Sequence, residues 1–358
     1  MSSSLLDNFK IVGIVFLFVL IIVPFIKKMA YHINAIDIPR TRHIHKEVMP
    51  KLGGVAIFLG FLLGYMLFCN QTPQMISILI GGFIIVFTGV LDDIKSLPSK
   101  VKFLGQIISA AIVVYYGGIV MQDVSAYGIY LNFGIFAKPL TILFIVSLIN
   151  CMNFVDGMDG LAAGIAEIYF ITISIIIYFT GIYNGLDASL TLIMMGAVLG
   201  FLFHNFYPAK IFMGDSGSMF LGYIISVVSL LGFKNVTITS FVVPVLILAI
   251  PILDTLFAII RRLLKHQSPA KADKEHLHHQ IFNKTNSQVK TVLIIYFVDI
   301  LFSLASIVYV IKNPELGQII YSILLVIIVW FILTTNIIFD RKKLKKDLEK
   351  RFHLGKDN

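Results

Sequence analysis

Short polar stretches interrupt a very apolar chain, and three of them carry five of its fifteen aspartates. One of them, NCMNFVDGMDGLAAG (residues 150–164), combines amides, carboxylates and glycines. The aspartates in these stretches are Asp92, Asp93, Asp156, Asp159 and Asp215. Neighbouring carboxylates repel one another unless they share a proton or a hard cation such as Mg²⁺. The pattern predicts metal-dependent chemistry on phosphates.

Each acidic motif also has a purely structural interpretation. Asp92 or Asp93 ends an apolar run and could cap the segment that follows. The stretch DGMDG could form two Asp-Gly turns. Asp215 stands between glycines in FMGDSGS, where it or Ser216 could be a helix N-cap, or it could bind a cation beside open backbone amides. These alternatives stay open for each motif taken alone.

The stretch HLHH supplies three histidines, namely His276, His278 and His279. A zinc site is one interpretation, but no cysteine accompanies the histidines and the surrounding loop is basic. Imidazoles near neutral pH donate hydrogen bonds or carry charge, so we favour a role next to phosphate groups. The neighbouring polar loops also contain lysines that could bind phosphate, namely Lys46, Lys95 and Lys102.

Long apolar runs must position these side chains. The sequence is 58% hydrophobic and 14% charged, with a mean hydropathy of +0.89, which is typical of an integral membrane protein. The runs are continuous rather than alternating, so we expect an all-α polytopic protein with about eleven membrane spans. The expected spans are 11–26, 53–69, 75–91, 103–120, 139–152, 161–179, 190–203, 219–233, 241–260, 291–311 and 319–339. A small hairpin is predicted within residues 117–138.

The distribution of basic residues predicts the orientation. If the N-terminus lies outside, twenty-five of the 29 Lys and Arg residues fall in cytoplasmic segments, as the positive-inside rule requires. The polar motifs then share the cytoplasmic face. The net charge of +9 is explained by these segments facing anionic lipid, so no nucleic acid is expected as a partner.

One membrane-embedded domain is expected over residues 1–340, followed by a basic cytoplasmic tail over 341–358. Cys69 and Cys151 lie near opposite ends of their spans, so no disulfide is expected. Asp254 and Asp299 lie inside spans, where interhelical hydrogen bonds explain them as well as function does. No ATP-binding or dinucleotide-binding fingerprint is found.

Five motifs together resemble a known family, the polyprenyl-phosphate N-acetylhexosamine-1-phosphate transferases (the WecA/TagO/MraY group). The motifs occur in family order between residues 37 and 282. They are DIPRTRHIHKEVMPKLGG, GVLDDIKSLPSKVKFLGQ, NCMNFVDGMDGLAAG, HNFYPAKIFMGDSGSMFLG and KADKEHLHHQIF. The histidine motif is similar to that of the WecA/TagO branch, which also has eleven spans with the N-terminus outside.

The resemblance implies a role for each matching residue. Asp215 would be the principal Mg²⁺ ligand, with Asn153 as a second group at the metal, and Mn²⁺ is an alternative ion. The acids Asp92, Asp93, Asp156 and Asp159 would be catalytic, Asp159 also lying in the nucleotide-binding loop. Uracil would be held by Asn205 and Phe212. The phosphate or lipid would be bound by Lys46, Lys95 and Lys102, and the sugar and phosphate by His276, His278 and His279.

By the same resemblance, the protein would transfer GlcNAc-1-phosphate from UDP-GlcNAc to undecaprenyl phosphate in the bacterial cytoplasmic membrane. This reaction would start wall teichoic acid or a related envelope glycan. A different UDP-N-acetylhexosamine donor is an alternative, and the possibility of a homodimer stays open. Two other classes remain, a secondary transporter and a scaffold, but transporter sites usually lie near the bilayer midplane rather than at one edge.

Overall fold

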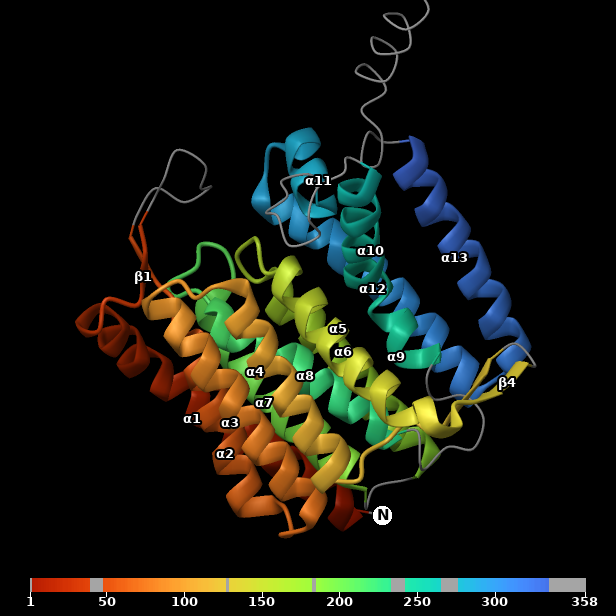
Figure 1. The fold of residues 1–358 in the computed structure, drawn as a ribbon, viewed down its shortest axis with the longest axis horizontal. Helices are drawn as coiled ribbons and strands as arrows, with labels where there is room; N and C mark the ends of the chain where they lie inside the picture. Colours follow the sequence, from red (N-terminus) through yellow and green to blue (C-terminus); the bar gives the residue numbers. More distant parts are fainter. Residues whose placement is uncertain are drawn as a thin grey trace, which may run out of the picture.

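The computed structural model describes residues 2–38, 48–126, 129–181, 185–232, 242–264 and 276–334. It is a bundle of helices joined by short connections (Figure 1). The helices are α1 (Ser2–His32), α2 (Gly53–Phe68), α3 (Pro73–Ile94), α4 (Ser99–Ala111), α5 (Ala137–Val155), α6 (Leu161–Thr180), α7 (Leu186–Asn205), α8 (Gly214–Gly232), α9 (Val242–Ile247), α10 (Ala249–Leu264), α11 (Leu277–Thr285), α12 (Gln288–Ile311) and α13 (Pro314–Thr334). A π-helical turn, Ile112–Tyr116, continues α4.

The long apolar helices make this an all-α, multi-pass membrane protein. In the described part of the chain, seven helices are long and apolar enough to cross a bilayer. Each of the predicted spans coincides with at least one helix. The predicted tail over 341–358 lies outside the described residues.

Two short antiparallel pairs of strands complete the described structure. Strand β1 (Ile36–Asp37) pairs with β2 (Met49–Pro50). Strand β3 (Asp123–Ala126) pairs with β4 (Ile129–Asn132), which confirms the hairpin predicted between residues 117 and 138.

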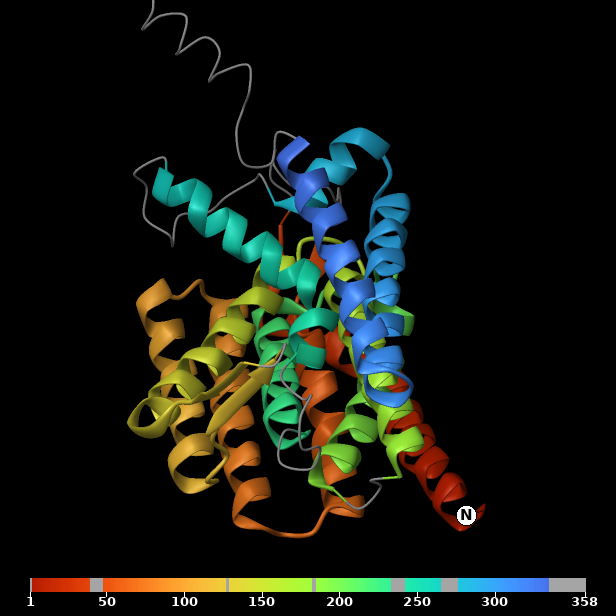
Figure 2. The same ribbon diagram turned by 90° about the vertical axis from the view of Figure 1, so that its right-hand side faces the viewer.

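The prediction of one continuous helix over 241–260 is wrong in one respect. The helix is interrupted at Leu248, between α9 and α10. Pro251 has no backbone N–H, so the carbonyl of Ile247 loses the hydrogen bond that would continue the helix. After this break, α10 leans out from the side of the bundle, as Figure 2 shows. The break therefore gives the last part of this segment its own direction.

Helix α8 lies at the centre of the bundle, with α3 and α5 as its most extensive neighbours (Figures 1 and 2). All its residues from Ser216 to Leu231 are buried. The neighbouring helices approach its first turn backbone to backbone at two glycines. A Cβ on Gly54 would lie 2.1 Å from the nitrogen of Gly217, and one on Gly89 would lie 2.3 Å from the Cα of Ser216. Any larger side chain at these positions would push α8 away from α2 or α3.

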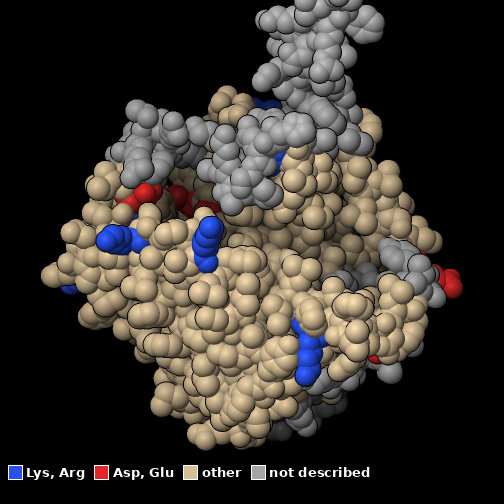
Figure 3. All heavy atoms as spheres, in the orientation of Figure 1, with Lys and Arg blue, Asp and Glu red and all other residues tan. Residues whose placement is uncertain are grey.

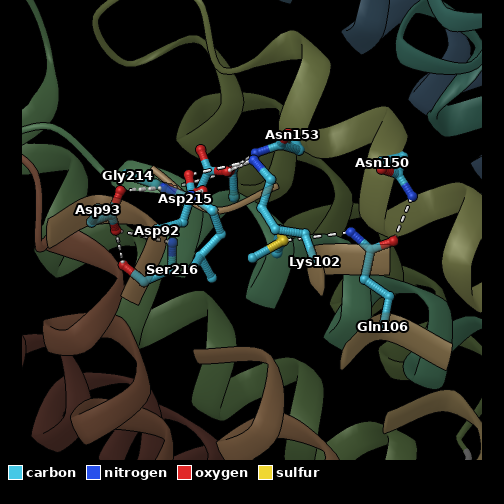
Figure 4. Close-up of polar contacts among 12 residues, drawn as sticks. Asp92, Asp93, Lys102, Gln106, Asn150, Asn153, Gly214, Asp215 and Ser216 are labelled. Carbon is cyan, nitrogen blue, oxygen red and sulfur yellow. Dashed lines mark hydrogen bonds and ion pairs between the residues drawn. The ribbon is translucent and has the colours of Figure 1, made fainter. Parts of the chain in front are cut away.

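This packing brings the polar motifs to one end of the bundle. The last turn of α3, the last turn of α5 and the first turn of α8 meet there (Figures 1 and 4). The N-terminus lies at the opposite end (Figure 1). The polar end therefore gathers residues that are more than a hundred positions apart in the sequence.

Candidate active site

Two carboxylates share one ammonium group at the centre of the polar end. The Nζ of Lys102 lies 2.7 Å from the Oδ2 of Asp215 and 3.3 Å from the Oδ2 of Asp92. The other oxygen of Asp92 accepts a hydrogen bond of 2.7 Å from the backbone N–H of Leu97. These three side chains come from α3, α4 and α8 and converge in Figure 4. They form what we call the aspartate centre: Asp92, Lys102 and Asp215.

The charge of Lys102 is stabilised by this arrangement. Burial on its own would lower the pKa of Lys102, but the carboxylates of Asp215 and Asp92 outweigh that effect and hold its pKa above the usual value. The lysine is therefore a cation near neutral pH. Its side chain keeps an exposed fraction of 24%, so solvent reaches the centre.

Asp93 faces another direction, although it is the next residue after Asp92. Its Oδ1 accepts a 2.9 Å hydrogen bond from the N–H of Asp215. Its Oδ2 accepts hydrogen bonds from the N–H and the hydroxyl of Ser216, at 3.1 Å and 2.8 Å. The carboxylate thus caps the N-terminus of α8, where free N–H groups need acceptors.

Glycine at position 214 makes this cap possible. Gly214 has a φ of +74°, a conformation that favours glycine, and a Cβ there would lie 2.4 Å from the Oδ2 of Asp93. The sequence MGDSGS thus places a glycine against the Asp93 carboxylate and two N–H groups toward it. The expectation of an N-cap by Asp215 or Ser216 differs from what is observed, because the capping carboxylate comes from α3.

The amides of the NCMNFV motif hold α5 against α4 and α8. The Nδ2 of Asn153 donates to the Oγ of Ser218 at 2.9 Å, and Asn153 also hydrogen-bonds the Asp215 side chain. The Nδ2 of Asn150 donates to the Oε1 of Gln106 at 2.7 Å. Asn153 therefore adjoins the aspartate centre, whereas Asn150 ties helices together farther away (Figure 4).

The acids of the DGMDG motif lie in the connection between α5 and α6. Burial, together with the charges of Asp215, Asp93 and Asp159, raises the pKa of the Asp156 carboxyl to about 8. The Oδ2 of Asp159 accepts a 3.0 Å hydrogen bond from the N–H of Ala209. Asp156 therefore experiences the field of the aspartate centre, while Asp159 fastens its loop to the segment after α7.

Asn205 uses both ends of its buried amide within the protein. Its Oδ1 accepts from the N–H of Gly160 at 3.1 Å, and its Nδ2 donates to the carbonyl of Ile211 at 3.0 Å. Phe212 is half-buried and its backbone pairs with Pro50 and Gly53. Asn205 thus links the loop that contains Gly160 to the segment that contains Ile211. The predicted uracil contacts of both residues remain predictions.

The predicted lysines do not share one environment. Lys102 belongs to the aspartate centre, and Lys95 is exposed at the end of α3. Lys46 lies outside the described residues. Figure 3 shows acidic atoms in a hollow at this end of the molecule, with Lys or Arg atoms at its edge.

The histidines form a second polar group, held by an aspartate of α10. The Nδ1 of His276 lies 3.1 Å from the Oδ2 of Asp254, and the N–H of Leu277 donates to its Oδ1 at 2.8 Å. The rings of His276 and His278 stack with centroids 5.7 Å apart, and His279 lies next to His278 at 4.3 Å. We call Asp254 and these three histidines the histidine group.

The histidine group touches the DGMDG loop. A Cβ on Gly157 would lie 2.5 Å from the Nε2 of His278, so the imidazole packs directly on this glycine. Burial lowers the pKa of His278 to about 3, with the neighbouring His279 and His276 acting in the same direction and Asp254 opposing it. His278 is therefore neutral near pH 7, and its ring can accept or donate a hydrogen bond at the loop.

The donors of the aspartate centre fit a magnesium ion. Mg²⁺ is usually bound by one or two carboxylates together with water and substrate phosphates, and Asp92 and Asp215 converge on a single positive charge. Asn153 adds an amide beside them. Among the described residues, no group of three His, Cys, Asp or Glu side chains could hold a metal alone. The site therefore fits an ion completed by substrate oxygens.

Two features of this end were not predicted from the sequence. Asp254 was explained equally well by a helix contact, and its carboxylate does bind α11, but its role in holding the histidines was missed. The signal available in the sequence was an acidic residue, Asp254, about two helical turns before Arg261 and Arg262. Nothing in the sequence indicated that Asp93 caps α8, because this contact depends on where the first turn of α8 lies relative to α3.

Asp299, the other acid within a span, is buried with both carboxylate oxygens lacking a hydrogen-bond partner in the described structure.

Comparisons with known proteins find sequence relatives of this chain. The sequence profile of glycosyl transferase family 4 matches residues 75–233, which include α3 through α8. The chain is 44% identical to the probable undecaprenyl-phosphate N-acetylglucosaminyl 1-phosphate transferase of Bacillus subtilis (strain 168), over 87% of this chain and 86% of that protein.

More distant relatives have similar names. The decaprenyl-phosphate N-acetylglucosaminephosphotransferase of Mycolicibacterium smegmatis is 34% identical over 76% of this chain and 74% of its own length. The undecaprenyl-phosphate alpha-N-acetylglucosaminyl 1-phosphate transferase of Escherichia coli (strain K12) is 28% identical over 75% of this chain and 74% of its own length. The similarity thus extends well beyond the short polar motifs.

Proposed function

Because the chain belongs to the polyprenyl-phosphate N-acetylhexosamine-1-phosphate transferases of glycosyl transferase family 4, we propose that it transfers GlcNAc-1-phosphate from UDP-GlcNAc to undecaprenyl phosphate. The products are undecaprenyl-diphospho-GlcNAc and UMP. The observation that carries the proposal is the aspartate centre, where two carboxylates and a charged lysine, all partly open to solvent, converge at one end of a membrane bundle. Such a site suits a reaction between two phosphates.

The reaction exchanges one pyrophosphate link for another. An oxygen of undecaprenyl phosphate attacks the β-phosphorus of UDP-GlcNAc, the new P–O bond forms, and the bond to UMP breaks. The lipid phosphate is largely ionised at pH 7, because the second pKa of a phosphomonoester is about 6. We therefore assign Asp92 and Asp215 to positioning Lys102 and holding a metal ion, rather than to removal of a proton.

The protein's own groups would hold the two anionic substrates together. Lys102 can contribute an ammonium donor to phosphate oxygens from its place between Asp92 and Asp215. His276, His278 and His279 would contact the donor near the DGMDG loop, on which His278 packs. When bound, Mg²⁺ would neutralise phosphate charge in the transition state. The residues that would hold it are Asp215, Asp92 and Asn153.

The reaction would take place on the cytoplasmic face of the bacterial cell membrane. The proposed topology has eleven spans and an external N-terminus, supported by the distribution of Lys and Arg and by the position of the N-terminus opposite the acids (Figure 1). UDP-GlcNAc is a soluble cytoplasmic donor and undecaprenyl phosphate is a membrane acceptor, so the two meet at this surface. We assign the product to the start of wall teichoic acid or a related envelope glycan.

A purified-protein assay tests the proposal. The full chain in lipid nanodiscs receives undecaprenyl phosphate, Mg²⁺ and radiolabelled UDP-GlcNAc, and label is followed into butanol-extractable lipid. We expect lipid-linked label that added UMP converts back to UDP-GlcNAc, and no label when EDTA is present. Transfer from a different UDP-sugar only would correct the donor, and no transfer from any UDP-sugar would refute the proposed function.

A further inference from the structure

The adjacent acids Asp92 and Asp93 sit in very different surroundings. Asp93 is 4% exposed, and its oxygens point at the first turn of α8. Asp92 is partly exposed and reaches Lys102 at 3.3 Å. Successive residues of an α-helix differ in direction by about 100°, so neighbours on α3 cannot face one point. The pair is therefore not a single two-carboxylate site.

Most of the hydrogen-bonding capacity of the Asp93 carboxylate, which has about four lone-pair positions, is used within the protein. Three donors from two residues, Asp215 and Ser216, bind its two oxygens at 2.8–3.1 Å. Gly214 closes the remaining side, since a Cβ there would lie 2.4 Å from Oδ2 and 2.7 Å from Oδ1. A substrate oxygen or an ion has no approach to this carboxylate.

The cap acts directly on the residue that carries the central carboxylate. The N–H of Asp215 donates to Asp93, and the side chain of the same Asp215 pairs with Lys102. Holding this backbone N–H sets where Asp215 begins α8 and so where its carboxylate points. Glycines at positions 54 and 89 press the same turn from two sides, so its position depends on close packing as well as on the cap.

We infer that Asp93 is a positioning residue: it clamps the N-terminus of α8 and thereby orients the Asp215 carboxylate toward Lys102 and the phosphates, without touching substrate. Asp92 alone of the pair then takes part in the aspartate centre. The inference rests on the proposed function for its activity test, but the clamp itself is a property of the fold. It predicts that the two neighbours respond oppositely to the same substitutions.

The test compares Asn and Glu at each position. Asn at 93 has the shape of Asp. Its oxygen can accept from the Asp215 N–H and its NH₂ can donate to the Ser216 hydroxyl, but the NH₂ then faces the Ser216 N–H, so that hydrogen bond is lost. We expect Asp93→Asn to lower kcat by about tenfold, as the loss of one buried hydrogen bond would. Asp93→Glu adds a methylene to a filled space and lowers kcat by about a hundredfold or more.

Asp92 is the matched control, and the order reverses there. Its side chain is partly open to solvent, so Glu fits and keeps a charge beside Lys102, whereas Asn loses that charge. We expect Asp92→Glu to be more active than Asp92→Asn. A more active Glu than Asn variant at position 93 would show that its carboxylate charge matters in the reaction, and would overturn the inference.

Two further measurements distinguish a positioning role of Asp93 from a general structural role. The pH profile of kcat should keep its shape in Asp93→Asn, because no proton acceptor is removed, and loss of its acid limb would overturn the inference. Hydrogen exchange followed by mass spectrometry should show faster exchange at the first turn of α8 in both Asp93 variants and not in Asp92→Asn. Unchanged exchange in Asp93→Asn would also overturn it.

A milder variant covers the case in which Asp93 variants fail to fold. Ser216→Ala removes only the 2.8 Å hydroxyl contact and should lower kcat about threefold, with faster exchange at the same turn. Wild-type exchange at this turn in Ser216→Ala would overturn the inference. Absence of sugar-phosphate transfer by the wild-type protein would refute the proposed function instead, and the exchange measurements would still decide whether Asp93 clamps α8.

Discussion

The aspartate centre and the histidine group are both held by a carboxylate that caps a helix, but the two capped helices differ in length and burial. In each, a carboxylate from one helix caps the first turn of another: Asp93 of α3 caps α8, and Asp254 of α10 caps α11. Helix α8 has 19 residues and is buried along almost its whole length. Helix α11 has nine residues, of which three are buried.

This difference indicates that one part of the site is held by many contacts, whereas the other depends mainly on one carboxylate. Asp93 receives three hydrogen bonds, and Gly54 and Gly89 bring α2 and α3 itself close against the turn that it caps. Asp254 accepts a hydrogen bond from the N–H of Leu277 and lies 3.1 Å from the Nδ1 of His276 and 3.9 Å from the Nδ1 of His278. We conclude that the aspartate centre is preorganised by the core, whereas the histidine group is oriented mainly by Asp254.

The largest expected effect comes from removing the central carboxylate. Asp215→Ala leaves Lys102 without its 2.7 Å partner and removes the main oxygen donor for a metal ion. We expect turnover to fall by about a thousandfold or more, since such groups contribute that much to transition-state stabilisation. The radiolabel assay measures the loss, with thermal unfolding as the control. A folded Asp215→Ala variant with Mg²⁺-dependent activity would contradict this role.

Removing the lysine of the same centre comes next. Lys102→Met leaves two carboxylates facing each other with no ammonium between them, so we expect kcat to fall by about a hundredfold. The Mg²⁺ concentration for half-maximal activity should fall too, because the competing charge is gone. Lys102→Arg keeps the charge with a different shape and serves as the control. If Lys102→Met instead needs a higher Mg²⁺ concentration, then Lys102 does not compete with Mg²⁺ for the carboxylates of Asp92 and Asp215.

The histidine group should give a smaller effect of another kind. Asp254→Asn weakens the hold on His276 but leaves the aspartate centre intact. We expect KM for the UDP-sugar to rise about tenfold with little change in kcat, because loss of one charge-assisted hydrogen bond has about this magnitude. The double variant with His276→Ala should be no worse than His276→Ala alone. Additive losses would show that Asp254 acts independently of the histidine.

The smallest expected effect is on stability, through His278. Its pKa is lowered to about 3 in the folded protein, so the unfolded chain binds more protons between that pH and its ordinary pKa of about 6.5. Stability therefore rises with pH through this range and is complete above it. Unfolding temperatures at pH 5 and pH 7 measure the effect. His278→Gln should reduce the difference, and an unchanged difference would assign it to other groups.

Much of the fold was predictable because the bilayer restricts what a chain can do. Long apolar runs with few charges must be helices, and helices do lie in the predicted spans. The hairpin of β3 and β4 was also predicted. The break at Leu248 was missed, although Pro251 within the run was a visible signal. Loose boundaries elsewhere follow from apolar residues that fit a helix and its flanks equally well.

The site was predictable as a set of residues but not as a set of roles. The sequence by itself determined a helical membrane protein with most of its acidic motifs, amides and histidines between the apolar spans, because charged groups are costly within the bilayer. Only the tertiary structure decided that Asp92 joins Lys102 and Asp215 while Asp93 clamps α8. The physical reason is geometric: neighbours on a helix face different directions, and each role depends on which distant helix end packs there.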